Sequence, residues 1–164
     1  MEREELLEIC EARGRFLLDI GAGPLAIIAA SRYGCRVVNI DIDPEALMRE
    51  RREIVERGMG ENIIFLRADA TDLPFIDASF DIVISYGALH HTPVERRERF
   101  IQEAFRVTGE KLCIAEYHRR AFPHDETEFK PVYPSWLEPR LCRLGRIERR
   151  SGEEMDVYIC WREI

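Results

Sequence analysis

Short apolar segments alternate along most of this chain with segments in which apolar residues recur every three or four positions. The first pattern is typical of buried strands and the second of amphipathic helices. We predict strands at 16–19, 36–41, 63–67, 80–85 and 111–116, and helices at 2–13, 25–33, 44–58 and 95–107. Strands that alternate with helices favour right-handed crossovers and a parallel sheet.

The last third of the chain has a different pattern. Four prolines fall within 121–139, so we expect irregular structure there, with at most one short helix at 135–144. Residues 146–150 and 155–161 are strand-like and are separated by the polar turn 151–154, which predicts a hairpin. We interpret residues 1–164 as a single domain.

Composition and charge narrow the class of protein. With 46% hydrophobic and 34% charged residues, the chain is typical of a globular protein and not of a disordered one. No apolar run is long enough for a membrane span, and the charged N-terminus does not resemble a secretory signal, so we expect a cytoplasmic protein. A net charge of −7 argues against a general nucleic-acid binder. The five cysteines form no C-x-x-C pair, which favours free thiols over a disulfide or a metal site.

A glycine turn follows the first predicted strand, in the segment FLLDIGAGPLAIIAA at 16–30. Glycines at positions 21 and 23 allow the backbone to approach a ligand closely, because they carry no side chain. The helix that follows directs its free N–H groups towards the same place. In an open α/β sheet, ligands bind at this edge, beyond the carboxyl ends of the strands.

Three acids, Asp19, Asp41 and Asp69, lie at the ends of the first three strands. The two carboxylate oxygens of Asp41 can accept hydrogen bonds from vicinal ribose hydroxyls. Asp69 can accept from an adenine amino group while the Ala70 N–H donates to a ring nitrogen. We expect Asp19 to hold the glycine turn through its backbone N–H groups. The alternative for each acid is a simple helix cap.

These motifs together resemble the class I S-adenosylmethionine-dependent methyltransferases, in the branch of the small-molecule and quinone-precursor enzymes. The resemblance rests on LLDIGAGPLAIIAA at 17–30, VVNIDIDPEAL at 37–47, IIFLRADATDLPFIDASFDIVISYGALHHT at 63–92 and FIQEAFRVTGEKLCIAEY at 100–117. It implies a three-layer, Rossmann-like α/β fold. The implied sheet has seven mostly parallel strands in the order 3-2-1-4-5-7-6 and an antiparallel terminal strand.

The resemblance also implies S-adenosylmethionine as cofactor and assigns its contacts. Gly21 and Gly23 would cradle the amino-acid half, and Asp41 would bind the ribose. Ile42 would pack on the adenine, whose edge Asp69 and Ala70 would recognise. Ser85 would face the methionine part through its backbone carbonyl.

The sequence departs from the family pattern in three places. Leu25 replaces a frequent third glycine, and the usual glycine-rich turn before the fifth strand is reduced to 108–111. Only about 15 residues precede the first predicted strand. We therefore expect an open donor pocket, or one that a second copy or a partner subunit completes.

The catalytic residue stays unassigned. Tyr86, His90 and His91 follow the fourth strand, near the expected methyl group, and a histidine there could accept a proton at neutral pH. His118 and the pair His124-Asp125 match no standard metal-ligand spacing, so we expect solvated loop residues and no metal. The Asn/Asp-Pro-Pro-aromatic pattern of nucleic-acid amino methyltransferases is missing from this position, which argues against adenine or cytosine amino groups as acceptors. We expect an unidentified small-molecule acceptor.

Two alternatives stay open. Residues 21–26 satisfy G-x-G-x-x-A, and Asp41 lies at a suitable distance for a ribose, as in nicotinamide-dependent oxidoreductases. Asp69, the terminal hairpin and the lack of a second nucleotide-binding half argue against that class. The second alternative is a non-catalytic subunit that binds the methyl donor on the same fold.

Overall fold

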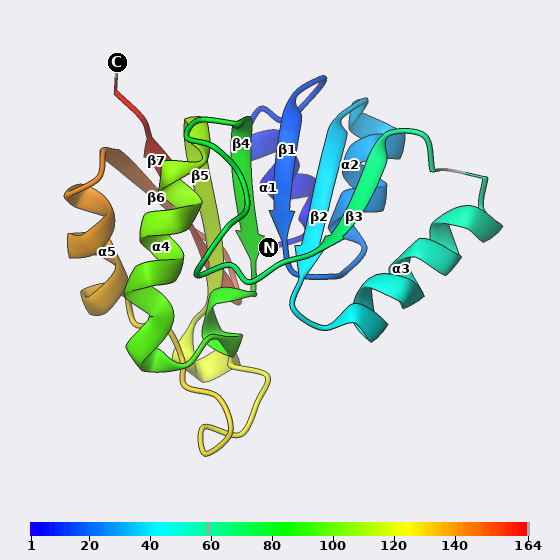
Figure 1. Cartoon of the computed structure of the whole chain (residues 1–164). Helices are drawn as coiled ribbons and strands as arrows, with labels where there is room; N and C mark the ends of the chain where they lie inside the picture. Colours follow the sequence, from blue (N-terminus) through cyan, green and yellow to red (C-terminus); the bar gives the residue numbers. More distant parts are fainter. Residues whose placement is uncertain (59, 164) are drawn as a thin grey trace.

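One seven-stranded sheet with helices on both faces makes up the computed structural model, which describes residues 1–58 and 60–163 (Figure 1). The strands are β1 (Phe16–Ile20), β2 (Arg36–Asp41), β3 (Ile63–Arg67), β4 (Phe80–Tyr86), β5 (Thr108–Tyr117), β6 (Arg146–Ser151) and β7 (Met155–Trp161). The helices are α1 (Arg3–Ile9), α2 (Leu25–Tyr33), α3 (Pro44–Glu56), α4 (Arg97–Arg106) and α5 (Pro134–Cys142). Three single-turn 3₁₀ helices, η1 (Leu89–His91), η2 (Val94–Arg96) and η3 (Arg119–Ala121), lie in the connections.

The strand order is β3-β2-β1-β4-β5-β7-β6, which confirms the order expected from the sequence. All neighbouring pairs from β3 to β5 are parallel. β7 lies between β5 and β6 and is antiparallel to both. The carboxyl ends of β1, β2, β3 and β4 therefore meet at one edge of the sheet, which is where the candidate site forms.

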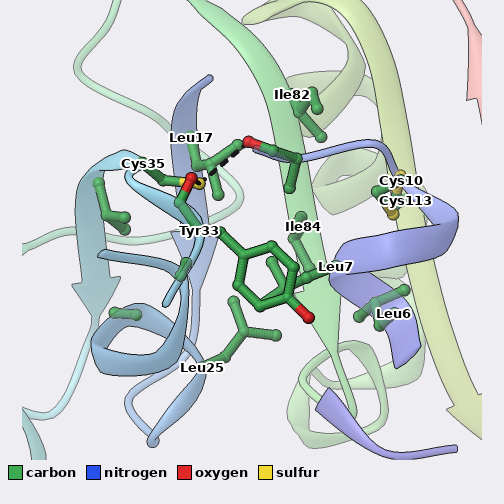
Figure 2. Packing of buried hydrophobic residues seen from close by; sticks show 14 of the residues in the cluster. Leu6, Leu7, Cys10, Leu17, Leu25, Tyr33, Cys35, Ile82, Ile84 and Cys113 are labelled. Carbon is green, nitrogen blue, oxygen red and sulfur yellow. Dashed lines mark hydrogen bonds between the residues drawn. The ribbon is translucent and has the colours of Figure 1, made fainter. Parts of the chain in front are cut away.

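Alternating side chains build the two hydrophobic cores. On β1, Leu17 packs on the face covered by α1 and α2, whereas Leu18 packs on the face covered by α4 and α5; both are fully buried. Figure 2 shows the first core, with Leu6 and Leu7 of α1 beside Ile84 of β4. Each fully buried leucine of this kind contributes about 1.5–3 kcal/mol to stability.

Local signals in the sequence define the ends of the helices. α2 ends at Gly34, whose left-handed conformation (φ 64°) is the one that glycine adopts without strain. α3 begins after Asp43, whose carboxylate accepts from the Glu45 N–H at 2.9 Å, and Pro44 occupies the first helical position. Both caps were predicted and are confirmed.

Three predicted boundaries are wrong. The helix predicted at 2–13 ends at Ile9, and Glu11 after it has a positive φ of 56°. The segment 108–111, expected as a turn, is the first part of β5, where a register shift lies in its pairing with β4. Gly109 fits there because a Cβ would come within 2.8 Å of the Phe80 carbonyl oxygen. α4 begins at Arg97 rather than at residue 95, since η2 forms directly after Pro93.

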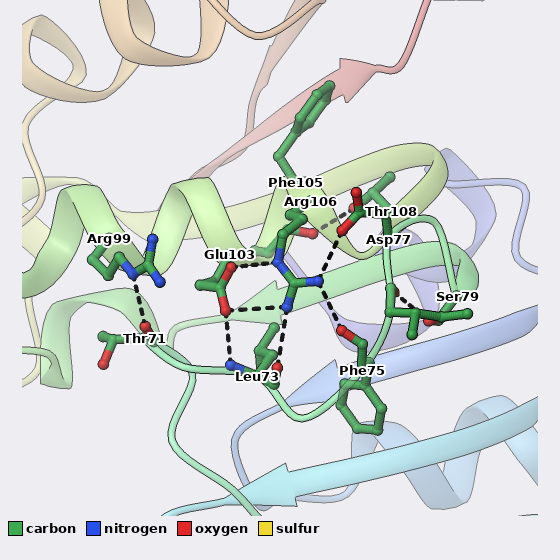
Figure 3. Close-up of polar contacts among 12 residues, drawn as sticks. Thr71, Leu73, Phe75, Asp77, Ser79, Arg99, Glu103, Phe105, Arg106 and Thr108 are labelled. Carbon is green, nitrogen blue, oxygen red and sulfur yellow. Dashed lines mark hydrogen bonds and ion pairs between the residues drawn. The ribbon is translucent and has the colours of Figure 1, made fainter.

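The connection between β3 and β4 contains no helix and is fixed instead to α4 by a polar clamp (Figure 3). Buried Glu103 accepts from the Leu73 N–H at 3.0 Å and from Arg106 at 2.5 Å. Arg106 also donates to the carbonyl oxygens of Leu73 and Phe75. This clamp matters for the site, because Asp69 and Ala70 lie at the start of the connection.

The structure also tests the expectations of free thiols and of no membrane-spanning segment. All five cysteines are free; four are buried as expected, but Cys142 at the end of α5 is exposed. Among the described residues, no helix combines the length and apolar character needed to cross a membrane.

Candidate functional site

A cavity of about 400 Å³ opens at the carboxyl edge of the sheet. Its walls come from the ends of β1 to β4, from the segment around η1 and η2, and from Arg3 of α1. The lining includes Asp19, Gly21, Gly23, Asp41, Ile42, Asp69, Ala70, Tyr86, Gly87, Ala88, His91 and Arg96. Seven of the eight residues predicted to bind the cofactor are in this set, so the structure brings them together.

The glycine turn has the shape that its sequence predicts. Gly21 has φ 102°, and a Cβ on it would lie 3.2 Å from the Ala88 Cβ. Its N–H donates to the Ile40 carbonyl oxygen at 2.8 Å, which joins the turn to β2. Gly23 has no such constraint, since a Cβ there would meet nothing within 4 Å. Gly21 is therefore required by the fold, whereas Gly23 leaves space beside the cavity.

Asn39 of β2, which was not predicted from the sequence, binds the glycine turn through its side chain. Its side-chain amide donates to the Asp19 carboxylate at 2.9 Å and to the Gly21 carbonyl oxygen at 3.0 Å. The expectation that Asp19 binds the N–H groups of the turn is wrong, because its carboxylate faces Asn39 instead. Burial raises the pKa of Asp19 well above its usual value. A polar residue inside the otherwise apolar strand 36–41 was the available signal for Asn39.

Asp41 connects β2 to the glycine turn. Its Oδ2 accepts from the Ala22 N–H at 2.8 Å, and its Oδ1 accepts from the Asp43 N–H at 2.9 Å. Each carboxylate oxygen can accept a further hydrogen bond. The side chain thus fixes the turn and still offers acceptors towards the cavity.

Asp69 is held by two partners at the end of β3. Its Oδ1 accepts from the backbone and the hydroxyl of Thr71, and its Oδ2 accepts from Arg96 at 3.0 Å. Burial alone would raise the pKa of Asp69, but the hydrogen bonds from Thr71 and Arg96 outweigh it and lower the pKa. Arg96 was not predicted, and no motif in the sequence pointed to its pairing with Asp69.

Ile42 and Ala70 lie where a flat apolar ligand group could pack. Ile42 lines the cavity with 58% of its surface exposed, which is unusual for a large aliphatic side chain. Ser85, in contrast, is fully buried within β4 and is not part of the lining. Tyr86 and Gly87, the next residues along the chain, line the cavity instead.

Tyr86 connects the cavity to the N-terminal segment. Its hydroxyl donates to the Met1 carbonyl oxygen at 2.7 Å, and the Arg3 guanidinium lies over its ring at 4.8 Å. Burial raises the pKa of Tyr86. Arg3 therefore forms part of the wall on this side of the cavity, and Met1 is held beside it through Tyr86.

The two candidate histidines have different environments. His91 lines the cavity, and burial, together with the neighbouring His90 and His124, lowers its pKa to about 4, so its ring is neutral at pH 7. His90 is only 2% exposed and is not part of the lining. The ring Nδ1 of His90 lies 2.9 Å from Glu116 Oε2, and the backbone N–H of His90 donates to Glu116 Oε1. Of the two, only His91 can contact a ligand in the cavity.

His124 is not the solvated loop residue that we expected. Its ring centroid lies 5.2 Å from that of His90 and 5.1 Å from that of His91. The aromatic ring of Phe129, from the same irregular segment, covers His91 at 4.6 Å. The segment 118–133 therefore packs on η1, a long-range contact that sequence spacing does not reveal.

The residues of the cavity fit an adenosine-containing methyl donor. The volume lies in the range of about 300–1,000 Å³ that is usual for small-molecule sites. Gly23 leaves space beside the cavity, and two carboxylates, Asp41 and Asp69, lie at neighbouring strand ends. A sheet of this order with such a site defines a class I S-adenosylmethionine-dependent methyltransferase domain.

The comparison with known families agrees. The model of the "Methyltransferase domain" family matches residues 18–111, and the chain belongs to this family. The resemblance to class I S-adenosylmethionine-dependent methyltransferases that was drawn from the sequence is confirmed.

Similar proteins act on diverse compounds. The chain is 26% identical over 154 residues to ajmaline N-methyltransferase of Rauvolfia serpentina, covering 92% of this chain and 48% of the relative. A solved S-adenosylmethionine-dependent methyltransferase from Aquifex aeolicus is 20% identical, with a TM-score of 0.76 over 99% of this chain and 90% of that one. Magnesium protoporphyrin IX methyltransferase from Synechocystis PCC 6803, solved with S-adenosylhomocysteine, is 17% identical, with a TM-score of 0.76 over 98% and 80%. This chain spans no more than half the length of the curated relatives it matches.

Proposed function

We propose that this chain transfers a methyl group from S-adenosylmethionine to a small-molecule acceptor whose identity is open. The observation that carries the proposal is the convergence of four strand ends on one cavity that contains the glycine turn, Asp41 and Asp69. Membership of the methyltransferase-domain family supports the same activity. The ajmaline enzyme among the relatives supports a small molecule as acceptor.

The bound donor supplies a methyl group on a positively charged sulfur. In our proposal, Asp41 accepts from the ribose hydroxyls while its bond to the Ala22 N–H keeps the glycine turn in place. Asp69 and Ala70 recognise the adenine edge, and Ile42 covers the ring. Gly21, Gly23 and Gly87 let the backbone approach the amino-acid half.

His91 is our candidate for the residue that contacts the acceptor. It lines the cavity, and its depressed pKa keeps the ring neutral and able to accept a hydrogen bond at pH 7. A base with a pKa of about 4 removes a proton poorly, so we assign His91 to positioning the acceptor rather than to deprotonating it.

Calorimetric titration tests the cofactor assignment. S-adenosylhomocysteine should bind with one site per chain, and NADH should give no heat. Saturable NADH binding without binding of S-adenosylhomocysteine would favour the oxidoreductase alternative. Binding of the donor without transfer to any acceptor in a panel of small amines, phenols and thiols would favour the non-catalytic subunit.

We also propose a cytoplasmic place of action and a cavity completed by a second copy or a partner. The free thiols support a reducing compartment. The exposure of Ile42, a large apolar side chain in the lining of the cavity, supports a cover from a second copy or a partner. Light scattering of the purified protein with and without S-adenosylhomocysteine tests the second point, because a chain that stays monomeric and methylates a small molecule alone contradicts it.

A further inference from the structure

Three of the four histidines of the chain gather beside the donor cavity. His90 and His91 belong to η1, and His124 reaches them from the irregular segment between β5 and α5. One ring nitrogen from each lies within 4.8 Å of the others. We call this group the histidine cluster.

His90 is oriented like a metal ligand. Its Nδ1 faces the Glu116 carboxylate at 2.9 Å, a geometry that favours the tautomer with the proton on Nδ1 and the acceptor at Nε2. Nε2 is buried and has no hydrogen-bond partner among the described residues. A buried polar atom without a partner is rare and costly, and a carboxylate behind a histidine is the usual support of a metal-binding ring.

Aromatic rings and a buried arginine surround the histidine cluster and hold it together. Phe122 packs on His90 at 5.2 Å between ring centroids, and Phe129 packs on His124 at 4.9 Å. Buried Arg97 donates to the carbonyl oxygens of His90, Lys130 and Pro131, which ties the irregular segment to η1. The positive charge of Arg97 opposes a cation nearby, and the negative charge of Glu116 offsets it.

We propose that His90, His91 and His124 bind one Zn²⁺ through their imidazole nitrogens. Three neutral nitrogen ligands suit Zn²⁺, and a set of three leaves the fourth position open for water or for an oxygen, nitrogen or sulfur of a ligand. Tetrahedral Zn–N bonds place the nitrogens roughly 3.3 Å apart, so nitrogens that now lie within 4.8 Å of one another need to approach by at most about 1.5 Å.

The proposed metal site lies beside the donor cavity, so its open coordination position could serve the reaction. His91 belongs to the histidine cluster and also lines the donor cavity, so a ligand on the metal would lie next to that cavity. A metal there would hold the nucleophilic atom of the acceptor and would replace the direct hydrogen bond to His91, because a neutral imidazole has only one acceptor nitrogen. This role rests on the proposed function, whereas metal binding itself does not.

Cobalt and zinc titrations of the tag-free, metal-stripped full chain test the site. Co²⁺ should give the intense visible absorption of four-coordinate cobalt at one equivalent, and Zn²⁺ should displace it. His124→Ala should abolish the absorption. Glu116→Gln keeps an acceptor for His90 but loses the charge, and should weaken Zn²⁺ binding roughly 10- to 100-fold.

His118→Gln is the matched control. His118 also lies on the irregular segment, but its ring contacts the Gly152 carbonyl oxygen and Asp156 rather than the cluster. This variant should bind Zn²⁺ like the parent. If Zn²⁺ binds the parent no more tightly than His124→Ala, or if His118→Gln loses as much affinity, the proposal is wrong and the histidines are only packed rings.

Binding of S-adenosylhomocysteine separates this inference from the proposed function. His124 is not part of the cavity lining, so His124→Ala should lose Zn²⁺ and keep S-adenosylhomocysteine. A parent protein that binds Zn²⁺ but no S-adenosylhomocysteine would contradict the donor assignment and leave the metal site standing.

Discussion

At the scale of single residues, the two glycines of the turn do different work. Gly21 combines a positive φ with a close approach to Ala88, whereas Gly23 has neither. The sequence motif does not distinguish them, because both positions are simply glycine. The structure separates a residue that the fold needs from one that leaves room beside the cavity.

Gly21→Ala and Gly23→Ala form a matched pair that tests this distinction. Gly21→Ala should lower the free energy of unfolding by about 1–3 kcal/mol, because its Cβ meets Ala88 and its φ is strained. Gly23→Ala should unfold like the parent in urea and lose affinity only for S-adenosylhomocysteine. Equal stability of the two variants would contradict the assignment.

Asp41 has a structural role and, in our proposal, a binding role. In Asp41→Ala the proposed ribose acceptors and the acceptor of the Ala22 N–H are lost together. We expect roughly 100-fold weaker binding of S-adenosylhomocysteine, about 3 kcal/mol, by calorimetry. Asp41→Asn keeps one acceptor for Ala22 and should lose less. Unchanged affinity in Asp41→Ala would contradict the ribose assignment.

At the scale of elements, the connection from β3 to β4 depends on α4. Its backbone has no helix of its own, so its N–H and carbonyl groups need partners from elsewhere. Glu103 and Arg106 provide them for Leu73 and Phe75. α4 therefore fixes the connection that begins at Asp69, although Glu103 of α4 lies thirty residues after Leu73 in the sequence.

The clamp predicts a pH dependence of stability. Arg106, together with the Leu73 N–H, lowers the pKa of Glu103 below its usual value near 4.5 despite burial. A lowered native pKa stabilises the fold above the unfolded pKa, and this contribution disappears as the pH falls through the native pKa. Urea unfolding between about pH 6 and pH 3 should therefore show stability falling with pH.

Glu103→Gln should be about 1–3 kcal/mol less stable than the parent at pH 7, and its stability should depend less on pH. Glu98→Gln is the control on the same helix, because Glu98 is exposed and lies 3.7 Å from Arg140. Parallel pH profiles for the parent and Glu103→Gln would show that the clamp does not carry the dependence.

At the scale of the whole molecule, the sequence predicted what depends on local patterns. The alternation of Leu17 and Leu18 between two cores, the cap at Asp43 and the hairpin of β6 and β7 all follow from neighbours in the chain. The family resemblance supplied the strand order, which local patterns alone do not determine.

The unpredicted features are contacts between distant segments. Arg96 reaches Asp69 across 27 positions, and His124 packs on His90 across 34. Asn39 under the turn and buried Ser85 depend on which way a strand residue faces next to its neighbours. Spacing along the chain carries no information on such contacts, so the histidine cluster emerged only in three dimensions.

The place of β7 has a consequence for how the chain is made. During synthesis, β5 emerges from the ribosome well before residues 155–161, which pair with its free side. Until then the nascent chain presents an unpaired strand edge beside Leu112 and Ile114, a template for aggregation. A chaperone that covers this edge would matter most while residues 155–161 are still inside the exit tunnel.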